Sequence, residues 1–287
     1  MLSALAAHLC PQQQGRLSTC CPAHGHASGA TCISWAAADA AAAGAARPQK
    51  VRLALIGCGQ ICRSSHWPGI ASHAHRYLEV TAVVDTLHGN ALAVADLIEG
   101  SRVQPRPAVF TDVKTALEAE AATSGVLFDA VDIMLPHHLH RPVAEQCFAA
   151  GRHVCLEKPM AHELEDAQAI LLAADAAAKT HGAVFFMAEQ SQFWPEVLCA
   201  KGLIESGAIG ELLAANCRMN SASKRDPQQP LPPHAAWRAS LAQSGGGVIM
   251  DGGAHWIRPL RMIMGEIEEV TGQVCAIARR TTHPVMI

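Results

Sequence analysis

The stretch "VRLALIGCGQIC", residues 51–62, joins a nearly continuous apolar run to a glycine turn. Such a run is typical of a strand buried on both faces of a parallel sheet. Gly57 permits a tight turn after that strand, and Gly59 lets a bound pyrophosphate approach the backbone where a helix begins. Cys62 stands where the third glycine of G-x-G-x-x-G is expected. The segment therefore predicts the first strand and phosphate-binding turn of a dinucleotide-binding sheet.

The region after this turn alternates between strand-like and helix-like segments. Apolar runs predict further strands at 77–85, 129–136, 153–159 and 182–189. Amphipathic or Ala/Leu-rich stretches between them predict helices at 90–99, 113–121, 140–150 and 163–179. Strands that alternate with helices indicate an α/β fold with a doubly wound parallel sheet and right-handed crossovers.

Asp85 ends the second predicted strand, 26 residues after Gly59. An acid at this place can accept hydrogen bonds from the hydroxyls of an adenosine ribose. No Lys or Arg follows in "DTLHGNA" (85–91), which favours NAD over NADP, although NADP remains possible. The alternative is that Asp85 only caps the next helix.

Glu157, Lys158 and Pro159 stand together at the end of the predicted strand 153–159. Ligands of open α/β sheets bind beyond the carboxyl ends of the strands, so Lys158 is expected to point into the cofactor crevice. Pro159 fixes the chain direction and allows a cis bond. A surface ion pair in a loop is the structural alternative.

Asp251 and His255 are four residues apart, which places both on one face of a helix. The alternative is a pair that only stabilises the helix. Oxidation of an alcohol needs a base for the hydroxyl proton, a cation beside the developing alkoxide and a hydride acceptor. His255, Lys158 and a nicotinamide would supply these three, and Asp251 would orient the imidazole.

The chain resembles the glucose–fructose oxidoreductase / inositol dehydrogenase family of Rossmann-fold enzymes. The resemblance runs from about residue 51 to residue 270 and rests on six motifs: "GCGQIC" (57–62), "VVD" (83–85), "LPHHLH" (135–140), "LEKP" (156–159), "WR" (237–238) and "GGGVIMDGGAHWI" (245–257). It implies oxidation of a secondary hydroxyl of a sugar, inositol or similar polyol, with hydride passing to NAD(P).

The resemblance also implies roles for individual residues. Lys158, His255 and Asp251 would be catalytic. The candidate cofactor-binding residues are Gly57, Gly59, Gln60, Ile61, Asp85, Pro136, His140, Glu157 and Lys158. Trp237 and Arg238 would line the substrate pocket together with Lys158 and His255. The alternative for Trp237 is a packing residue.

Three regions are expected. Residues 1–48 are Ala-rich, with Asp39 as their only acid, and suit a transit peptide or a disordered extension. Residues 49–189 would form the Rossmann domain. Residues 190–287 would form an incomplete α+β domain for substrate binding and oligomerisation, with strands at 212–220 and 268–279. Relatives build an open, mostly antiparallel sheet there and form homo-oligomers.

Two features depart from the family pattern. Arg258 and Pro259 follow the histidine motif and are expected to reshape the pocket or break the helix. The short region after Gly265 leaves room for about one further strand, which suggests truncation. A non-catalytic NAD(P)-binding or regulatory protein is therefore the alternative function.

Other classes of function are disfavoured. The net charge of −3 and the lack of basic runs argue against a nucleic-acid partner. No apolar stretch approaches the ~20 residues of a membrane span. Among His137, His138 and His140, the first and last have the His-x-x-His spacing that occurs at zinc sites. No further ligand outside this cluster is evident nearby, so no metal is expected. The cytoplasm is the expected compartment, or a chloroplast or mitochondrion if residues 1–48 are a transit peptide.

Overall fold

The computed structural model describes residues 50–218 and 231–273, apart from 124 and 126. Its centre is a sheet of six parallel strands in the order β3-β2-β1-β4-β5-β6. The strands are β1 (Val51–Ile56), β2 (Leu78–Val84), β3 (Ala108–Phe110), β4 (Ala130–Ile133), β5 (His153–Glu157) and β6 (Phe185–Ala188). This order reverses at β1, so the fold is the predicted doubly wound α/β sheet.

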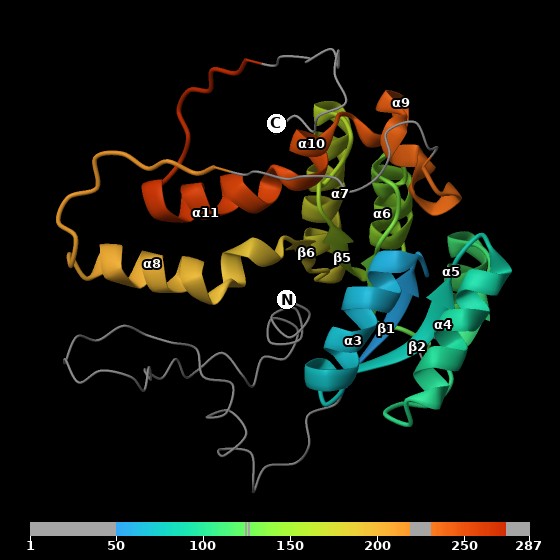
Figure 1. Ribbon diagram of the computed structural model, residues 1–287. Coiled ribbons are helices and arrows are strands. Elements are labelled where there is room, and N and C mark those ends of the chain that lie inside the picture. The colour runs from blue at the N-terminus through green and yellow to red at the C-terminus, as the bar shows by residue number, and fades with distance from the viewer. Residues whose placement is uncertain (1–49, 124, 126, 219–230, 274–287) are drawn as a thin grey trace, which may run out of the picture.

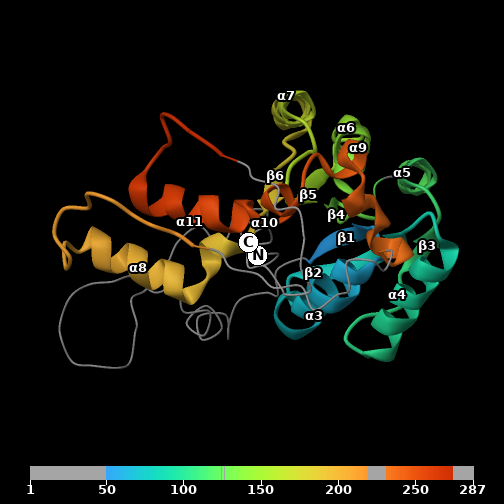
Figure 2. The same ribbon diagram turned by 45° about the horizontal axis from the view of Figure 1, so that its top comes forward.

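Helices cover both faces of the sheet (Figure 2). One face carries the helical segment η2–α3–η3 (residues 62–74) and α4 (His88–Gly100). The other carries α5 (Val113–Ala122), α6 (His140–Ala149) and α7 (Leu164–His181). Within the first segment, Cys62–His66 (η2) and Ile70–Ala74 (η3) are π-helical on either side of α3 (Trp67–Gly69).

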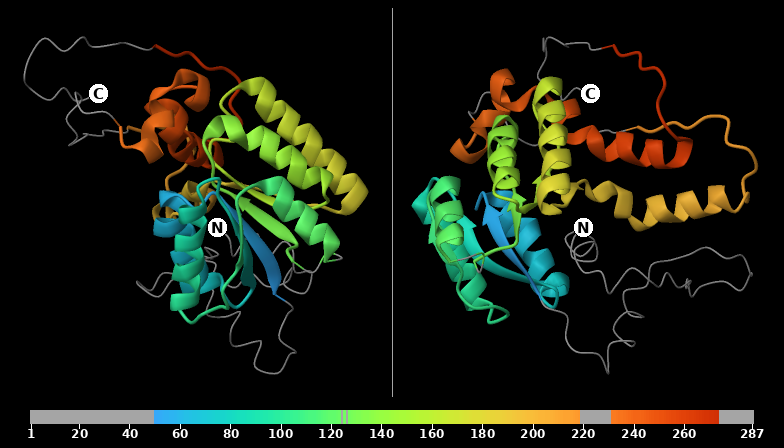
Figure 3. Two further views of the ribbon diagram at one scale, coloured as in Figure 1. Left: turned by 90° about the vertical axis from the view of Figure 1, so that its right-hand side faces the viewer. Right: turned by 180° about the vertical axis from the view of Figure 1, so that it is seen from behind.

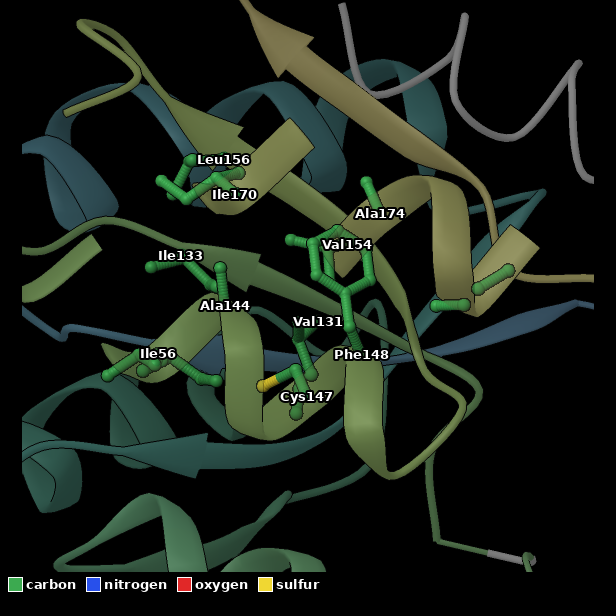
Figure 4. Packing of buried hydrophobic residues seen from close by; sticks show 14 of the residues in the cluster. Ile56, Val131, Ile133, Ala144, Cys147, Phe148, Val154, Leu156, Ile170 and Ala174 are labelled. Carbon is green, nitrogen blue, oxygen red and sulfur yellow. The ribbon is translucent and has the colours of Figure 1, made fainter. Parts of the chain in front are cut away.

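Alternation along β1 divides the core into two clusters. Leu53 and Leu55 point to the cluster that contains Trp67. Ala54 and Ile56 point to the opposite cluster, where α6 and α7 pack on the sheet (Figure 4). Successive side chains of a strand point to opposite faces, so a run that is apolar at every position needs a helix layer on both sides.

The predicted strands and helices of the sheet region are present with boundary shifts of a few residues. The strand β3 was not predicted. It has only three residues, Ala108–Phe110, lies at the edge of the sheet and pairs with β2 alone. Such a short edge strand leaves almost no periodic signal in the sequence.

The part after β6 consists of helices among the described residues. They are η5 (Gln190–Phe193), α8 (Pro195–Glu205), η6 (Pro233–Ala239), α9 (Leu241–Ser244), α10 (Val248–Gly252) and α11 (Ala254–Met264). Helices α8 and α11 run side by side away from the sheet (Figures 1 and 3), and α11 packs on η5 and α8.

Two expectations for this part need correction. Residues 212–218 and 268–273 contain no strand, so the predicted antiparallel sheet is not formed by the residues that the structure describes. Helix α11 continues through Pro259, which does not break it. The proline removes one backbone donor, and the helix has residues on both sides that keep their own hydrogen bonds.

Residues 1–48, the predicted leader, lie outside the described residues. Among the described helices, the longest is α7 with 18 residues, and none combines the length and apolar character that crossing a bilayer requires.

Candidate active site

The glycine turn follows β1 at the carboxyl edge of the sheet. Gly57 has φ +96°, and a Cβ there would collide with the backbone carbonyl of Met134. A Cβ on Gly59 would meet nothing within 4 Å, so this glycine faces open space. The helix begins at the exposed Gln60 and Ile61. An open backbone at a helix start is suited to a pyrophosphate.

Asp85 lies directly against this turn. Its Oδ2 accepts a hydrogen bond from the backbone N–H of Cys58 (2.9 Å), and its Oδ1 accepts one from that of Leu87 (2.8 Å). The helix α4 receives no side-chain cap at its first turn. The carboxylate therefore links the glycine turn to the end of β2. Oδ1 also accepts from Nδ2 of Asn90 (3.4 Å), whereas Oδ2 keeps a lone pair for a further donor.

Lys158 follows β5 directly, and its bond to Pro159 is cis. Its Nζ donates to the backbone oxygen of Asp251 (2.7 Å) and lies 3.4 Å from Oδ1 of the same residue. Its backbone N–H donates to Oε2 of Glu157 (3.0 Å). The ammonium thus points from the edge of the sheet toward α10.

Asp251 forms ion pairs with two cations, Lys158 and Arg238. Its Oδ1 faces Lys158, and its Oδ2 accepts from Nε of Arg238 at 3.2 Å. Burial acts to raise the pKa of Asp251, but the charges of Lys158 and Arg238 outweigh it and hold the pKa below its ordinary value. The carboxylate is ionised and fixes both cations beside α10.

The partner of His255 is not Asp251. Its Nδ1 lies 2.8 and 3.0 Å from the two carboxylate oxygens of Glu189, which is buried. Asp251 instead forms ion pairs with Lys158 and Arg238. Its spacing of four residues from His255 therefore does not make the two residues partners. Burial acts to raise the pKa of Glu189, and the hydrogen bonds from His255 and Ser191 more than offset it, so this pKa is lowered.

Lys158 and Glu189, which contact Asp251 and His255, follow the ends of two neighbouring strands. Glu157 pairs with Ala188 across β5 and β6, so Lys158 and Glu189 are the next residues of two adjacent parallel strands. Lys158 contacts the last turn of α10, and His255 lies in the first turn of α11. The sheet edge and the α10–α11 segment therefore bring the predicted lysine and histidine to one region.

The loop before α6 contributes buried histidines. His140 is fully buried, and its ring lies between the carbonyl oxygens of Leu135 (2.9 Å) and Pro159 (3.0 Å). Its side chain therefore joins two loops and does not face the crevice, contrary to the predicted cofactor contact. Pro136 is half-buried immediately before η4 (His137–Leu139).

His137 reaches the α9–α10 region. Its Nδ1 donates to the backbone oxygen of Ser244 (2.9 Å), and its ring packs edge-on against Trp237, with 4.6 Å between centroids. The guanidinium of Arg238 lies 4.3 Å from the Trp237 ring centre. A small cavity of about 180 Å³ adjoins these groups and is lined by His137, Arg238, Ser244, Gly246, Gly247, Val248 and Asp251.

Two family models match this chain. Residues 51–187 match the oxidoreductase family with an NAD-binding Rossmann fold, and residues 197–284 match the GFO/IDH/MocA C-terminal domain. The chain belongs to the GFO/IDH/MocA family.

Relatives within the family act on sugars, as their names state. The chain is 34% identical to levoglucosan dehydrogenase of Pseudarthrobacter phenanthrenivorans over 49% of its own length and 34% of that protein. It is 27% identical to D-xylose 1-dehydrogenase [NADP(+)] of Haloarcula marismortui over 75% of its length and 54% of that protein. Among solved structures, the WlbA dehydrogenase of Bordetella pertussis in complex with NADH and UDP-GlcNAcA aligns with a TM-score of 0.60 at 27% identity, covering 81% of this chain and 60% of that one. The chain thus spans between one third and three fifths of the length of these relatives.

Two acids and a histidine of the candidate site were not predicted from the sequence. Glu189 follows a strand, and the argument that placed Lys158 at the sheet edge applies equally to it. His66 and Asp132 carry no such signal, because one lies in a π-helical turn and the other inside a buried strand. Among the described residues, no group of three His, Cys, Asp or Glu side chains could hold a metal ion.

Proposed function

We propose that this chain transfers a hydride between NAD(P) and a secondary alcohol of a sugar, inositol or similar polyol. One observation carries the proposal: Nζ of Lys158 lies 2.7 Å from the backbone oxygen of Asp251, just before the helix turn that carries His255. This contact supports a shared site for a cation and an imidazole at the sheet edge, where the open glycine turn also lies. The family membership and the sugar dehydrogenases among the relatives support the assignment.

Lys158 is the residue that binds the reacting hydroxyl. Its side chain is 17% exposed, and its ammonium has three donors, of which two face the backbone oxygen and Oδ1 of Asp251. A remaining donor can point at the substrate oxygen and stabilise the alkoxide that forms as the proton leaves. Such a fixed donor in a site with little water contributes more than the same group in solution.

His255 is the base that accepts the hydroxyl proton. Glu189 binds Nδ1, so this nitrogen carries the hydrogen and Nε2 keeps its lone pair for the proton of the substrate. The buried carboxylate of Glu189 also stabilises the imidazolium that results. Asp251 holds Lys158 and Arg238 in place and is a positioning residue in this scheme.

The dinucleotide supplies the hydride acceptor when it is bound. Gly57, Gly59, Gln60 and Ile61 fit its pyrophosphate, since Gly59 faces open space and the helix begins at Gln60. The carboxylate of Asp85 would accept the ribose hydroxyls and repel a 2′-phosphate, which favours NAD. Arg63 donates to Asn90 (2.8 Å), which lies beside Asp85, and is the cation through which NADP could be accommodated.

The substrate would occupy the side of the site formed by η6, α9 and α10. Trp237 offers an aromatic face of the kind that packs on a sugar ring, and Arg238 offers donors for its hydroxyls. The match of residues 197–284 to the family's C-terminal domain supports a substrate role for residues 190–287. We propose that this region binds the substrate and takes part in the homo-oligomer expected from the sequence.

The test is turnover of NAD by the purified chain with a panel of aldoses, inositols and anhydrosugars. Lys158→Ala is expected to lower kcat/KM by about 10²–10³-fold, as the loss of one fixed donor to a developing oxyanion does. Lys179→Ala is the matched control, because Lys179 is exposed on α7 and pairs with Asp175 of the same helix.

Two results would contradict the proposal. Equal turnover of the wild type and Lys158→Ala would remove the lysine from the mechanism. Tight NADH binding with no turnover on any substrate would favour the non-catalytic NAD(P)-binding protein.

A further inference from the structure

His66 lies between two carboxylates beneath the proposed site. Its Nδ1 is 2.6 Å from Oδ2 of Asp132, and its Nε2 is 2.7 Å from Oε1 of Glu157. The exposed fraction of the side chain is 3% for His66, 0% for Asp132 and 12% for Glu157. Three ionisable groups from η2, β4 and β5 are thus in contact and nearly out of reach of water.

The number of protons in this cluster follows from the geometry. An ionised carboxylate accepts hydrogen bonds and donates none, whereas a neutral imidazole has a single N–H. With both carboxyl groups ionised, a donor is needed at each ring nitrogen, and only an imidazolium supplies two. Burial acts to lower the pKa of His66, but the two carboxylates outweigh it and raise the pKa to about 10.

Two buried thiols, Cys155 and Cys62, lie near the cluster. Burial and the charge of Asp132 raise the pKa of Cys155. Cys62, in the same turn as His66, has its pKa raised by a hydrogen bond with Cys58 and by burial. Both thiols stay neutral, so the cluster carries two carboxylates and one cation.

The cluster connects the Lys158 segment to the glycine turn of the proposed cofactor site. Glu157 uses its second oxygen, Oε2, to accept the backbone N–H of Lys158. On the other side, His66 ends the π-helical turn that follows the glycine turn, and the N–H of Arg63 in that turn donates to the backbone oxygen of Gly59 (3.3 Å). π-Helical turns are rare and occur often at functional sites.

We propose that His66, held as an imidazolium, is a positioning residue that ties the glycine turn to the segment carrying Lys158. By fixing the rotamer of Glu157 it sets the direction of the Lys158 peptide, and it couples that peptide to the helix that opens at the cofactor turn. This inference rests on the proposed function only for its effect on turnover.

The first test reads the protons directly. The full chain is labelled with ¹⁵N-histidine, and its ring nitrogens are observed by NMR at about pH 8, above the ordinary histidine pKa of about 6.5. One imidazolium signal is expected in the wild type and in His73→Gln, and its absence in His66→Gln assigns it. His73 is the matched control, since it is exposed on η3. Neutral rings throughout the wild type would overturn the proposal.

A second variant serves if His66→Gln does not fold. Glu157→Gln keeps the size of the side chain but turns one acceptor into a possible amide donor. His66 can then accept at Nε2 and lose its second proton. Loss of the imidazolium signal with the histidine still present supports the cluster as its cause, and an unchanged imidazolium signal would overturn it.

The third test reads the position of Lys158 without any substrate. The rate of acylation of Nζ by a small amine-reactive ester is measured by peptide mass spectrometry, with the exposed Lys179 as internal reference. His66→Gln is expected to change the relative rate at Lys158 by about tenfold, a typical size for coupled contacts, and His73→Gln is expected to leave it unchanged. An unchanged rate in a folded His66→Gln protein would overturn the positioning role.

Turnover separates this inference from the proposed function. If the wild type is inactive on all substrates but the imidazolium and the altered lysine rate are found, the enzyme assignment fails and the positioning role stands. If turnover depends on Lys158 while His66→Gln leaves kcat and the pH profile unchanged, the enzyme assignment stands and the positioning role fails.

Discussion

Two buried histidines hold the Lys158 segment from opposite sides, and they do so in opposite charge states. His66 contacts Glu157 before the lysine, and His140 contacts the carbonyl of Pro159 after it. Both are almost fully buried, with exposed fractions of 4% and 0%. Carboxylate partners raise the pKa of His66 to about 10, whereas burial among carbonyl groups lowers the pKa of His140 to about 4.

The comparison shows that burial alone does not decide the charge of a histidine. Burial disfavours the imidazolium in both places. Asp132 and Glu157 supply two full charges to His66, which exceed that cost. The carbonyls around His140 supply only dipoles, so its ring stays neutral and donates from one nitrogen. Replacing each histidine by an apolar residue should therefore have different consequences.

The largest effect is expected for His66→Leu. The substitution leaves Asp132 and Glu157 close together without their cation, and breaking a buried ion pair from one side costs about 3–5 kcal/mol of unfolding free energy. Urea denaturation followed by circular dichroism measures it. A loss below about 1 kcal/mol would mean that one of the carboxyl groups is protonated in the native protein.

The double variant His66→Leu/Asp132→Leu is the control for that interpretation. Replacing both members of a buried pair by apolar residues is often close to neutral, because no unpaired charge remains. The double variant should be more stable than His66→Leu alone. If the double variant lost as much unfolding free energy as the two single variants together, lost packing and not an unpaired charge would explain the effect of His66→Leu.

A smaller loss is expected for His140→Leu. The leucine removes a neutral hydrogen bond and leaves buried carbonyl oxygens without a donor, which costs about 1–3 kcal/mol. The same urea titration measures the change. A loss as large as that of His66→Leu would indicate that His140 is also a cation, and the contrast between the two residues would then disappear.

The pH dependence of stability should distinguish the two histidines by sign. The pKa of His66 is raised on folding, so its contribution is fully present below about 6.5 and is lost as pH rises toward about 10. The pKa of His140 is lowered, so its contribution is present above about 6.5 and is lost as pH falls toward about 4. Within each pH window, the unfolding free energy should change by about 1.4 kcal/mol per pH unit.

The measurement is a series of urea titrations across both windows, with the two leucine variants alongside the wild type. His66→Leu should flatten the alkaline limb, and His140→Leu should flatten the acid limb. If each variant instead changed the other limb, the charge states would be assigned the wrong way round.

The sheet could be predicted from the sequence because its signals are local. Apolar runs separated by helical segments sufficed for five strands, and the glycine turn located the first of them. The place of Lys158 followed from a general rule about strand ends. The strand at 108–110 was missed because a three-residue edge strand buries too little to leave a pattern.

The pairing of charged groups could not be predicted in the same way. The four-residue spacing predicted that Asp251 pairs with His255. In the structure, Asp251 pairs with Lys158 and Arg238, and Glu189 pairs with His255. Lys158 is 93 residues from Asp251 in the chain, and Glu189 is 66 residues from His255. Only the packing of α10 and α11 on the sheet edge determines which carboxylate meets which cation.

The smallest effect is expected where an ion pair is open to water. Arg238 and Asp251 are 45% and 38% exposed, and exposed pairs contribute about 0–1 kcal/mol. Arg238→Ala should therefore change the unfolding free energy by less than His140→Leu, and added salt should reduce the difference further. Urea titrations at low and high salt test this. A loss approaching that of His66→Leu would mean that Asp251 depends on Arg238 as Glu157 depends on His66, and the stabilising charges of the site would then lie on α10 as well as beneath Lys158.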